Sequence, residues 1–161
     1  MATPAGFVEP VKTLERSALL EVPAPVAYAV IVDVLRYPDF VPGCEGVEVQ
    51  RTTPTGLVAQ VAVAGRGLHE SFVTENIHQP FESVVMSLRE GPFEVLEGRW
   101  QLTPLGETGC RIDLHIEFIP KGVLARVLSG FIDRIANRVV DSFSDRIASE
   151  YQLILQQQEG Q

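Results

Sequence analysis

The sequence has few of the residues that support the chemistry most easily recognised from a pattern. Its 161 residues include two cysteines, Cys44 and Cys110, and three histidines. The cysteines lie far apart without metal-ligand spacing, so we expect free thiols, as in a reducing cytoplasm. The histidines also lack metal-ligand spacing, and no Gly-rich phosphate loop or Ser-His-Asp pattern occurs. We therefore predict no metal site, no required cofactor and no catalytic residue.

Long apolar runs are also missing. No stretch approaches the roughly 20 apolar residues that a membrane-spanning helix needs. Residues 1–11 lack the charged start and the apolar block of a signal peptide, so we expect a cytoplasmic protein. The net charge of −8 argues against a general nucleic-acid binder, and we expect no DNA contact. With only two lysines, any basic contact must come largely from arginine.

The last quarter of the chain predicts a long amphipathic helix over residues 122–158. Apolar side chains recur there at spacings of three and four, and so share one stripe: Leu128, Ile132, Ile135, Ala136, Val139, Phe143, Ile147 and Tyr151. At 1.5 Å per residue the helix would be about 55 Å long, whereas a ten-residue strand spans about 33 Å. The stripe rotates near Gly130, where we expect a bend.

Residues 14–119 predict mostly short strands separated by turns that contain Gly or Pro. The alternating segments are 14–22, 47–53, 57–65, 68–78, 83–90, 95–103 and 109–119, and helical spacing predicts one helix over 25–35. This pattern indicates an α+β fold with an antiparallel meander. We expect one domain over residues 14–155, with a loose N-terminal arm (1–13) and a frayed tail (156–161).

The apolar stripe of the terminal helix needs a partner, and no second long helix is predicted. It must therefore close on the dry face of the sheet, leaving a tapering space that either fills with core or holds a hydrophobic ligand. Trp100 belongs to that core or to the wall of that space. The pattern of residues 68–78 does not decide which of the two faces of this strand points inward. We favour an exposed Glu70, because burying a carboxylate without a partner costs free energy. On the helix, Arg134 and Arg138 alternate with aspartates, which favours a solvated face.

Three motifs resemble the coenzyme Q-binding START-like family. Residues 33–44, DVLRYPDFVPGC, are similar to its D-v-x-x-Y-P-x-F-x-P-x-C segment. Gly91-Pro92-Phe93, followed by Leu96, Gly98 and Trp100, is similar to its G-P-F-x-x-L-x-G-x-W stretch. Val140, Phe143 and Arg146 match the v-x-x-F-x-x-R pattern of its last helix. The resemblance covers residues 14–151, nearly the whole chain.

The resemblance implies a helix-grip fold of the START/Bet v 1 type, in which a curved antiparallel sheet wraps a long C-terminal helix. It also implies non-enzymatic binding of ubiquinone or another prenylated lipid in support of respiration, with transient contact at the inner-membrane surface. The family includes ribosome-association toxins (RatA), which is the alternative function. Glu70 and Glu75 stand where we expect basic residues in toxin-type members, so we rank ribosome contact lower. A polyketide cyclase/dehydrase-like enzyme ranks third, because no acid–base pair stands out.

We predict a hydrophobic ligand site between the sheet and the helix. Its mouth would be formed by residues 37–42 and by the helix around Leu128. The predicted site residues are Tyr37, Phe40, Phe72, Met86, Leu88, Trp100, Leu114, Leu128, Phe131, Ile135, Val139 and Phe143.

Overall fold

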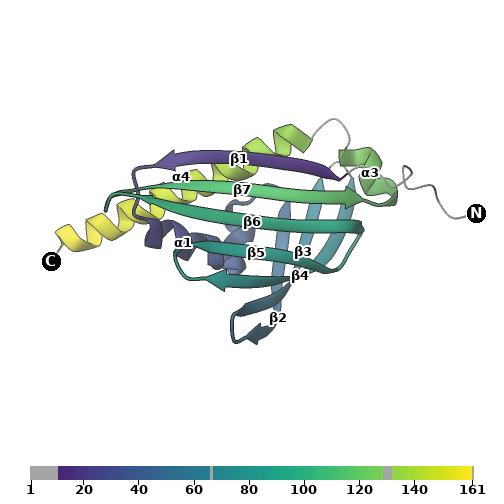
Figure 1. Cartoon of the computed structure of the whole chain (residues 1–161), viewed down its shortest axis with the longest axis horizontal. Helices are drawn as coiled ribbons and strands as arrows, with labels where there is room; N and C mark the ends of the chain where they lie inside the picture. The colour runs from purple at the N-terminus through teal and green to yellow at the C-terminus, as the bar shows by residue number, and fades with distance from the viewer. Residues whose placement is uncertain (1–10, 66, 129–131, 161) are drawn as a thin grey trace, which may run out of the picture.

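The computed structural model describes residues 11–65, 67–128 and 132–160 (Figure 1). The N-terminal part contains β1 (Lys12–Leu20), α1 (Ala24–Val32), the 3-10 helix η2 (Val34–Arg36) and α2 (Tyr37–Phe40). Six strands follow: β2 (Cys44–Thr53), β3 (Gly56–Gly65), β4 (Leu68–Gln79), β5 (Ser83–Glu90), β6 (Phe93–Leu105) and β7 (Gly109–Pro120). The chain ends with α3 (Gly122–Leu128) and α4 (Ile132–Glu159).

The strands form one antiparallel sheet in the order β1-β7-β6-β5-β4-β3-β2. From β2 to β7, each strand pairs with the one that follows it in the chain, which confirms the predicted meander. Strand β1 pairs with β7 and forms one edge of the sheet. Register shifts in β2, and between β4 and β5, bend the sheet. In Figure 1 the strands β2 and β3 run across the direction of β1 and β7, and α4 lies along the sheet. This arrangement confirms the predicted helix-grip fold.

One face of the sheet, here called the inner face, packs against the helices. Val84, Trp100 and Leu114 are cross-strand partners, so their side chains share this face, and all three are buried. Phe143 and Ile147 of α4 belong to the same hydrophobic core, together with Ile31 of α1 and others. The apolar face of the alternating segment that contains residues 110–118 therefore packs against the apolar stripe of the terminal helix. The opposite face, the outer face, carries His115 and Glu117.

The helices differ from the sequence expectation in three places. The predicted helix over 25–35 ends at Val32, and η2 begins after Asp33, whose ψ of 72° interrupts the helical backbone. The terminal helix is two helices, α3 and α4, and the bend expected near Gly130 lies outside the described residues. Residues 156–159, expected to fray, continue α4, because the glutamines there are good helix formers.

The N-terminal boundary also shifts. Lys12 and Thr13 were expected in a loose arm, but they pair with Phe118 and Glu117 of β7 and so extend β1. Residues 1–10 lie outside the described part, and the domain limits stay a prediction. In the part of the chain that the structure describes, no helix combines the length and the apolar character needed to cross a membrane.

The burial of α4 gives a test of the fold within one helix. Ile147 is fully buried, whereas Leu153 is 52% exposed. We expect Ile147→Ala to lower the free energy of unfolding by about 2–5 kcal/mol, because it leaves a cavity in the core. Leu153→Ala should stay within about 0.5 kcal/mol of the unsubstituted protein. Urea unfolding measures both, and equal losses would contradict the orientation of α4.

Candidate ligand-binding site

Four of the predicted site residues form an aromatic cluster around Phe143. The centroid of the Phe143 ring lies 5.2 Å from that of Tyr37, 5.0 Å from that of Phe40 and 4.8 Å from that of Trp100. Phe143 and Trp100 are each 2% exposed. The three partners come from α2 and β6, so a single ring from α4 joins three elements. Edge and tilted contacts of this kind add stability beyond the area buried.

Tyr37 anchors the cluster through a polar contact. Its hydroxyl donates a hydrogen bond to the backbone carbonyl of Ile31 in α1. Burial of the phenol, with the nearby charge of Asp33 as the next cause, raises the pKa of Tyr37 far above its ordinary value of 10.0. The side chain therefore stays neutral and holds α2 against the end of α1, which fixes Phe40 beside Phe143.

The inner face is filled unevenly. Trp100, Leu114 and the strand partners beside them are buried, but the next row along the sheet remains partly exposed. Met86 and Ile116 flank Gly98 in that row, and a Cβ at Gly98 would lie 2.8 Å from the Met86 methyl group. The Met86 side chain thus folds across the sheet over Gly98, and a Cβ at this position would make the Met86 methyl group move. Leu88 is also partly exposed, although it shares the inner face.

The remaining predicted residues divide between core, surface and undescribed positions. Phe72 is half-buried and meets Phe93 with ring centroids 6.0 Å apart. Val139 is half-buried and packs on the main core. Ile135 is 40% exposed, because the adjacent Ala136 takes the buried position on the stripe. The Leu128 side chain and the whole of Phe131 lie outside the described residues.

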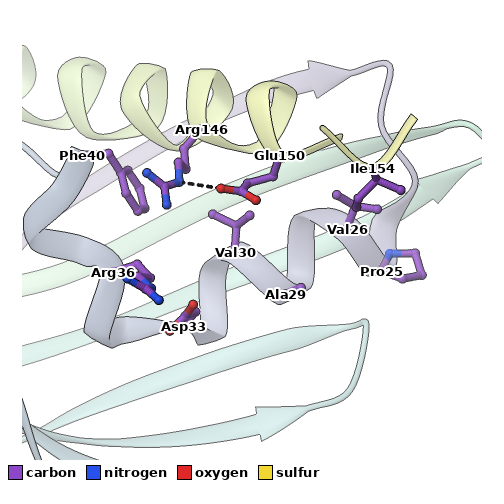
Figure 2. Close-up of a pocket in the computed structure, with 10 residues that line it drawn as sticks. All are labelled: Pro25, Val26, Ala29, Val30, Asp33, Arg36, Phe40, Arg146, Glu150 and Ile154. Atoms are coloured by element: carbon purple, nitrogen blue, oxygen red, sulfur yellow. Dashed lines mark ion pairs between the residues drawn. The ribbon is translucent and has the colours of Figure 1, made fainter. Parts of the chain in front are cut away.

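A pocket of about 590 Å³ lies between α1 and α4 (Figure 2). Its rim carries two acidic and two basic side chains, and Arg146 donates from Nε to Glu150 Oε1 at 3.1 Å. The Arg146 guanidinium also lies 5.2 Å from the centroid of the Phe40 ring, within range of a cation–π contact. The lining residues are Pro25, Val26, Ala29, Val30, Asp33, Arg36, Phe40, Arg146, Glu150 and Ile154.

Sequence reasoning found only Phe40 among these lining residues. The spacing of Arg146 and Glu150, four apart on one helix, is a signal for their ion pair. Nothing local in the sequence places α1 against α4, however, so the pocket itself could not be found in this way. Phe40 lies between the pocket and Phe143, because its ring lines the pocket and also contacts the Phe143 ring.

A second pocket, of about 470 Å³, lies on the outer face along β5, β6 and β7. His115 is part of its lining, and its ring nitrogens lie 2.8 Å from Glu15 and 3.3 Å from Glu117. Hydrogen bonds to Glu117 and Glu15 raise the pKa of His115. This pocket has no lining residue from α4, and the α1–α4 pocket has none from the sheet. An internal cavity between sheet and helix therefore stays a prediction.

Two further sequence expectations concern charge. Glu70 shares the inner face with Phe72, and its side chain is half-buried beside Val63 rather than fully exposed. Arg134, Arg138, Asp141 and Asp145 are exposed, as expected for a solvated helix face. Within residues 11–65, 67–128 and 132–160, no cluster of His, Cys, Asp and Glu side chains could hold a metal ion.

The comparisons with known proteins agree with this geometry. A family model described as polyketide cyclase/dehydrase and lipid transport matches residues 20–144. The ribosome association toxin RatA of Vibrio cholerae is 36% identical over 141 residues, which cover 87% of this chain and 98% of that protein.

Two solved structures share the fold. The Zhui aromatase/cyclase of a Streptomyces species has a TM-score of 0.78 at 17% identity, covering 86% of this chain and 94% of that one. A START superfamily protein from Mycobacterium smegmatis has a TM-score of 0.70 at 18% identity, covering 85% and 97%.

The buried Tyr37 phenol predicts how stability changes at alkaline pH. Because its pKa is raised in the folded state, its contribution is complete below pH 10 and is lost as the pH rises above 10. Replacing Tyr37 with Phe removes that contribution, so the unfolding free energy of the variant should fall less steeply above pH 10 than that of the unsubstituted protein. Urea unfolding between pH 8 and 11 measures this. Tyr151→Phe is the control, and equal slopes for all three proteins would contradict the buried phenol.

Proposed function

Since this chain belongs to the polyketide cyclase/dehydrase and lipid-transport family, we propose that it binds a hydrophobic small molecule on the inner face of its sheet. The ligand we propose is a prenylated quinone of the ubiquinone type, or a lipid like it. Binding would be non-enzymatic. The Zhui aromatase/cyclase shares only the fold at 17% identity, and a likeness of that kind carries no activity with it.

One observation supports the proposal most directly. The apolar side chains that point inward from β4, β5 and β6 retain partial exposure, whereas the same face is closed around Trp100. Met86, Leu88 and Phe72 are in this group, and all three are partly exposed. Burying apolar surface contributes about 0.025 kcal/mol per Å². A long isoprenoid tail laid over these side chains would therefore gain substantial affinity without an ion pair.

The route to this face would pass Phe40. Its ring lies between the α1–α4 pocket and the Phe143 ring, and it belongs to a helix of four residues held by the Tyr37 hydrogen bond. A rotation of the Phe40 side chain would open a path from the pocket toward the Phe143 ring. Residues 37–42 would then form the mouth of the site, as the sequence predicts.

A tryptophan scan along β5 tests where the ligand sits. Met86 and Leu88 point to the inner face, whereas Ser87 between them points outward. We expect Met86→Trp to weaken binding of a short-chain ubiquinone at least tenfold, because the indole fills the space over Gly98. Ser87→Trp should bind as the unsubstituted protein does. Titration calorimetry measures both, and normal binding by a folded Met86→Trp protein would place the ligand elsewhere.

A second candidate function is ribosome association, favoured by the RatA relative that matches nearly end to end. The structure offers one surface for it. Arg16 of β1 donates from Nε to the Asn137 side chain of α4 at 2.6 Å, and the same helix carries the exposed Arg134 and Arg138. Exposed arginines thus lie on α4, although the chain as a whole carries a net charge of −8. A local patch of this kind could contact phosphates.

Salt dependence tests this candidate. Each neutralised phosphate makes affinity fall as salt rises, whereas ligand uptake on an apolar face exchanges few ions. Ribosome association through the arginine surface predicts co-sedimentation with ribosomal subunits at low salt that weakens steadily as salt increases. It also predicts loss of co-sedimentation in an Arg134→Glu/Arg138→Glu variant. Absence of co-sedimentation at low salt, or full binding by the variant, would contradict this role, and ubiquinone uptake should be unchanged throughout.

A further inference from the structure

The inner face carries polar side chains where an apolar one would be expected. Thr74 is 6% exposed and Asn76 is 4% exposed, and both lie on β4. Their partners on β5 are Leu88 and Met86, which are apolar and partly exposed. Side chains paired across antiparallel strands share a face, so the two polar groups point the same way as the proposed ligand surface. They lie next to the row where the packed core around Trp100 ends.

The hydrogen bonds of these groups are incomplete. The Thr74 hydroxyl donates to Asn76 Oδ1 at 2.8 Å, which turns the amide nitrogen of Asn76 away from Thr74. Among the described residues, that nitrogen has no hydrogen-bond partner, and it is not one of the fully enclosed unpaired atoms, so it stays accessible to a ligand. His78, two residues further along the same face, also has a buried Nε2 without a partner in the described structure. Buried polar groups are nearly always paired, and each unpaired one costs stability.

The cross-strand neighbours of Asn76 and Thr74 are uncharged. Its strand partners are Leu57 and Met86, and those of Thr74 are Ala59 and Leu88. Burial lowers the pKa of His78, which keeps its ring neutral near pH 7. Without a cation beside it, this polar group is suited to a neutral oxygen acceptor. A fatty-acid carboxylate would have no countercharge here and would carry a large desolvation cost.

We infer that the Asn76 amide donates a hydrogen bond to an oxygen of an uncharged, oxygenated ring, and that Thr74 positions the amide for this contact. The inference rests on the proposed function and names the head-group end of that same site. The tail would run along β4 from Asn76 toward Phe72. Four residues of strand span about 13 Å, enough for the ring and the start of an isoprenoid chain.

The test compares two probes that share a tail and differ in the head. One is a ubiquinone with two isoprene units, and the other is an isoprenoid hydrocarbon of similar length. Binding is followed by calorimetry and by quenching of Trp100, the single tryptophan. We expect Asn76→Leu to weaken quinone binding about tenfold and to leave hydrocarbon binding unchanged. The melting temperature should fall modestly, because the substitution leaves the buried Thr74 hydroxyl without its acceptor, Asn76 Oδ1.

The control removes an amide from the other side of the sheet. Gln60 of β3 points to the outer face, where its Nε2 donates to Ser71 Oγ at 3.2 Å. Gln60→Leu should bind both probes normally. Thr74→Val keeps the Asn76 amide but frees its orientation, and should weaken quinone binding about threefold. This second variant keeps the inference testable if Asn76→Leu does not fold.

The outcomes separate the inference from the proposed function. If the unsubstituted protein binds neither probe, the proposed function fails and the inference fails with it. If it binds both probes equally well, the apolar surface is real but the head-group contact is overturned. Quinone binding that is unchanged in Asn76→Leu, or in Thr74→Val where only that variant folds, also overturns the contact. Selective loss of quinone binding in these variants, with Gln60→Leu normal, supports it.

Discussion

The packing of Phe143 against three other rings is the contact on which the rest of the structure depends. α4 approaches the sheet over only part of its length, and this one side chain joins it to Trp100 of β6 and to Tyr37 and Phe40 of α2. The core around these rings also includes Ile147 and Ile31. One end of the inner face is thereby closed, and the position of the helix over the remaining face follows from it.

Ala136 of α4 also packs with Leu14 and Phe118 in a second buried cluster, so the incompletely covered part of the inner face lies on β4 and β5. From the Trp100 row toward Phe72, the inward apolar side chains Met86, Leu88 and Phe72 are partly exposed, whereas the polar Thr74 and Asn76 beside them are buried. A protein selected for stability alone would be expected to fill this region, because each unfilled position loses packing energy. Apolar side chains that face inward yet stay accessible are the surface that the proposed hydrophobic ligand would cover.

The strands could be predicted from the sequence because their signal is local. Alternation in β7 and the Gly and Pro residues at the turns place the bounds of all seven strands within a few residues. The parity of β4 could not be decided in the same way, because polar residues occupy both of its faces. Only pairing with Leu88 and Met86 shows that Thr74 and Asn76 point inward. The α1–α4 pocket was missed for a similar reason, since it depends on how distant elements pack.

The two candidate functions use different faces of α4. Ala136, Phe143 and Ile147 are buried against the sheet and α1, whereas Arg134 and Arg138 are exposed on the opposite side. A hydrophobic ligand would contact the inner surface only, and ribosomal RNA could contact the outer surface only. Evidence for one function therefore does not count against the other. The proposed hydrophobic ligand concerns the inner surface, while the exposed arginines of α4 concern the outer one.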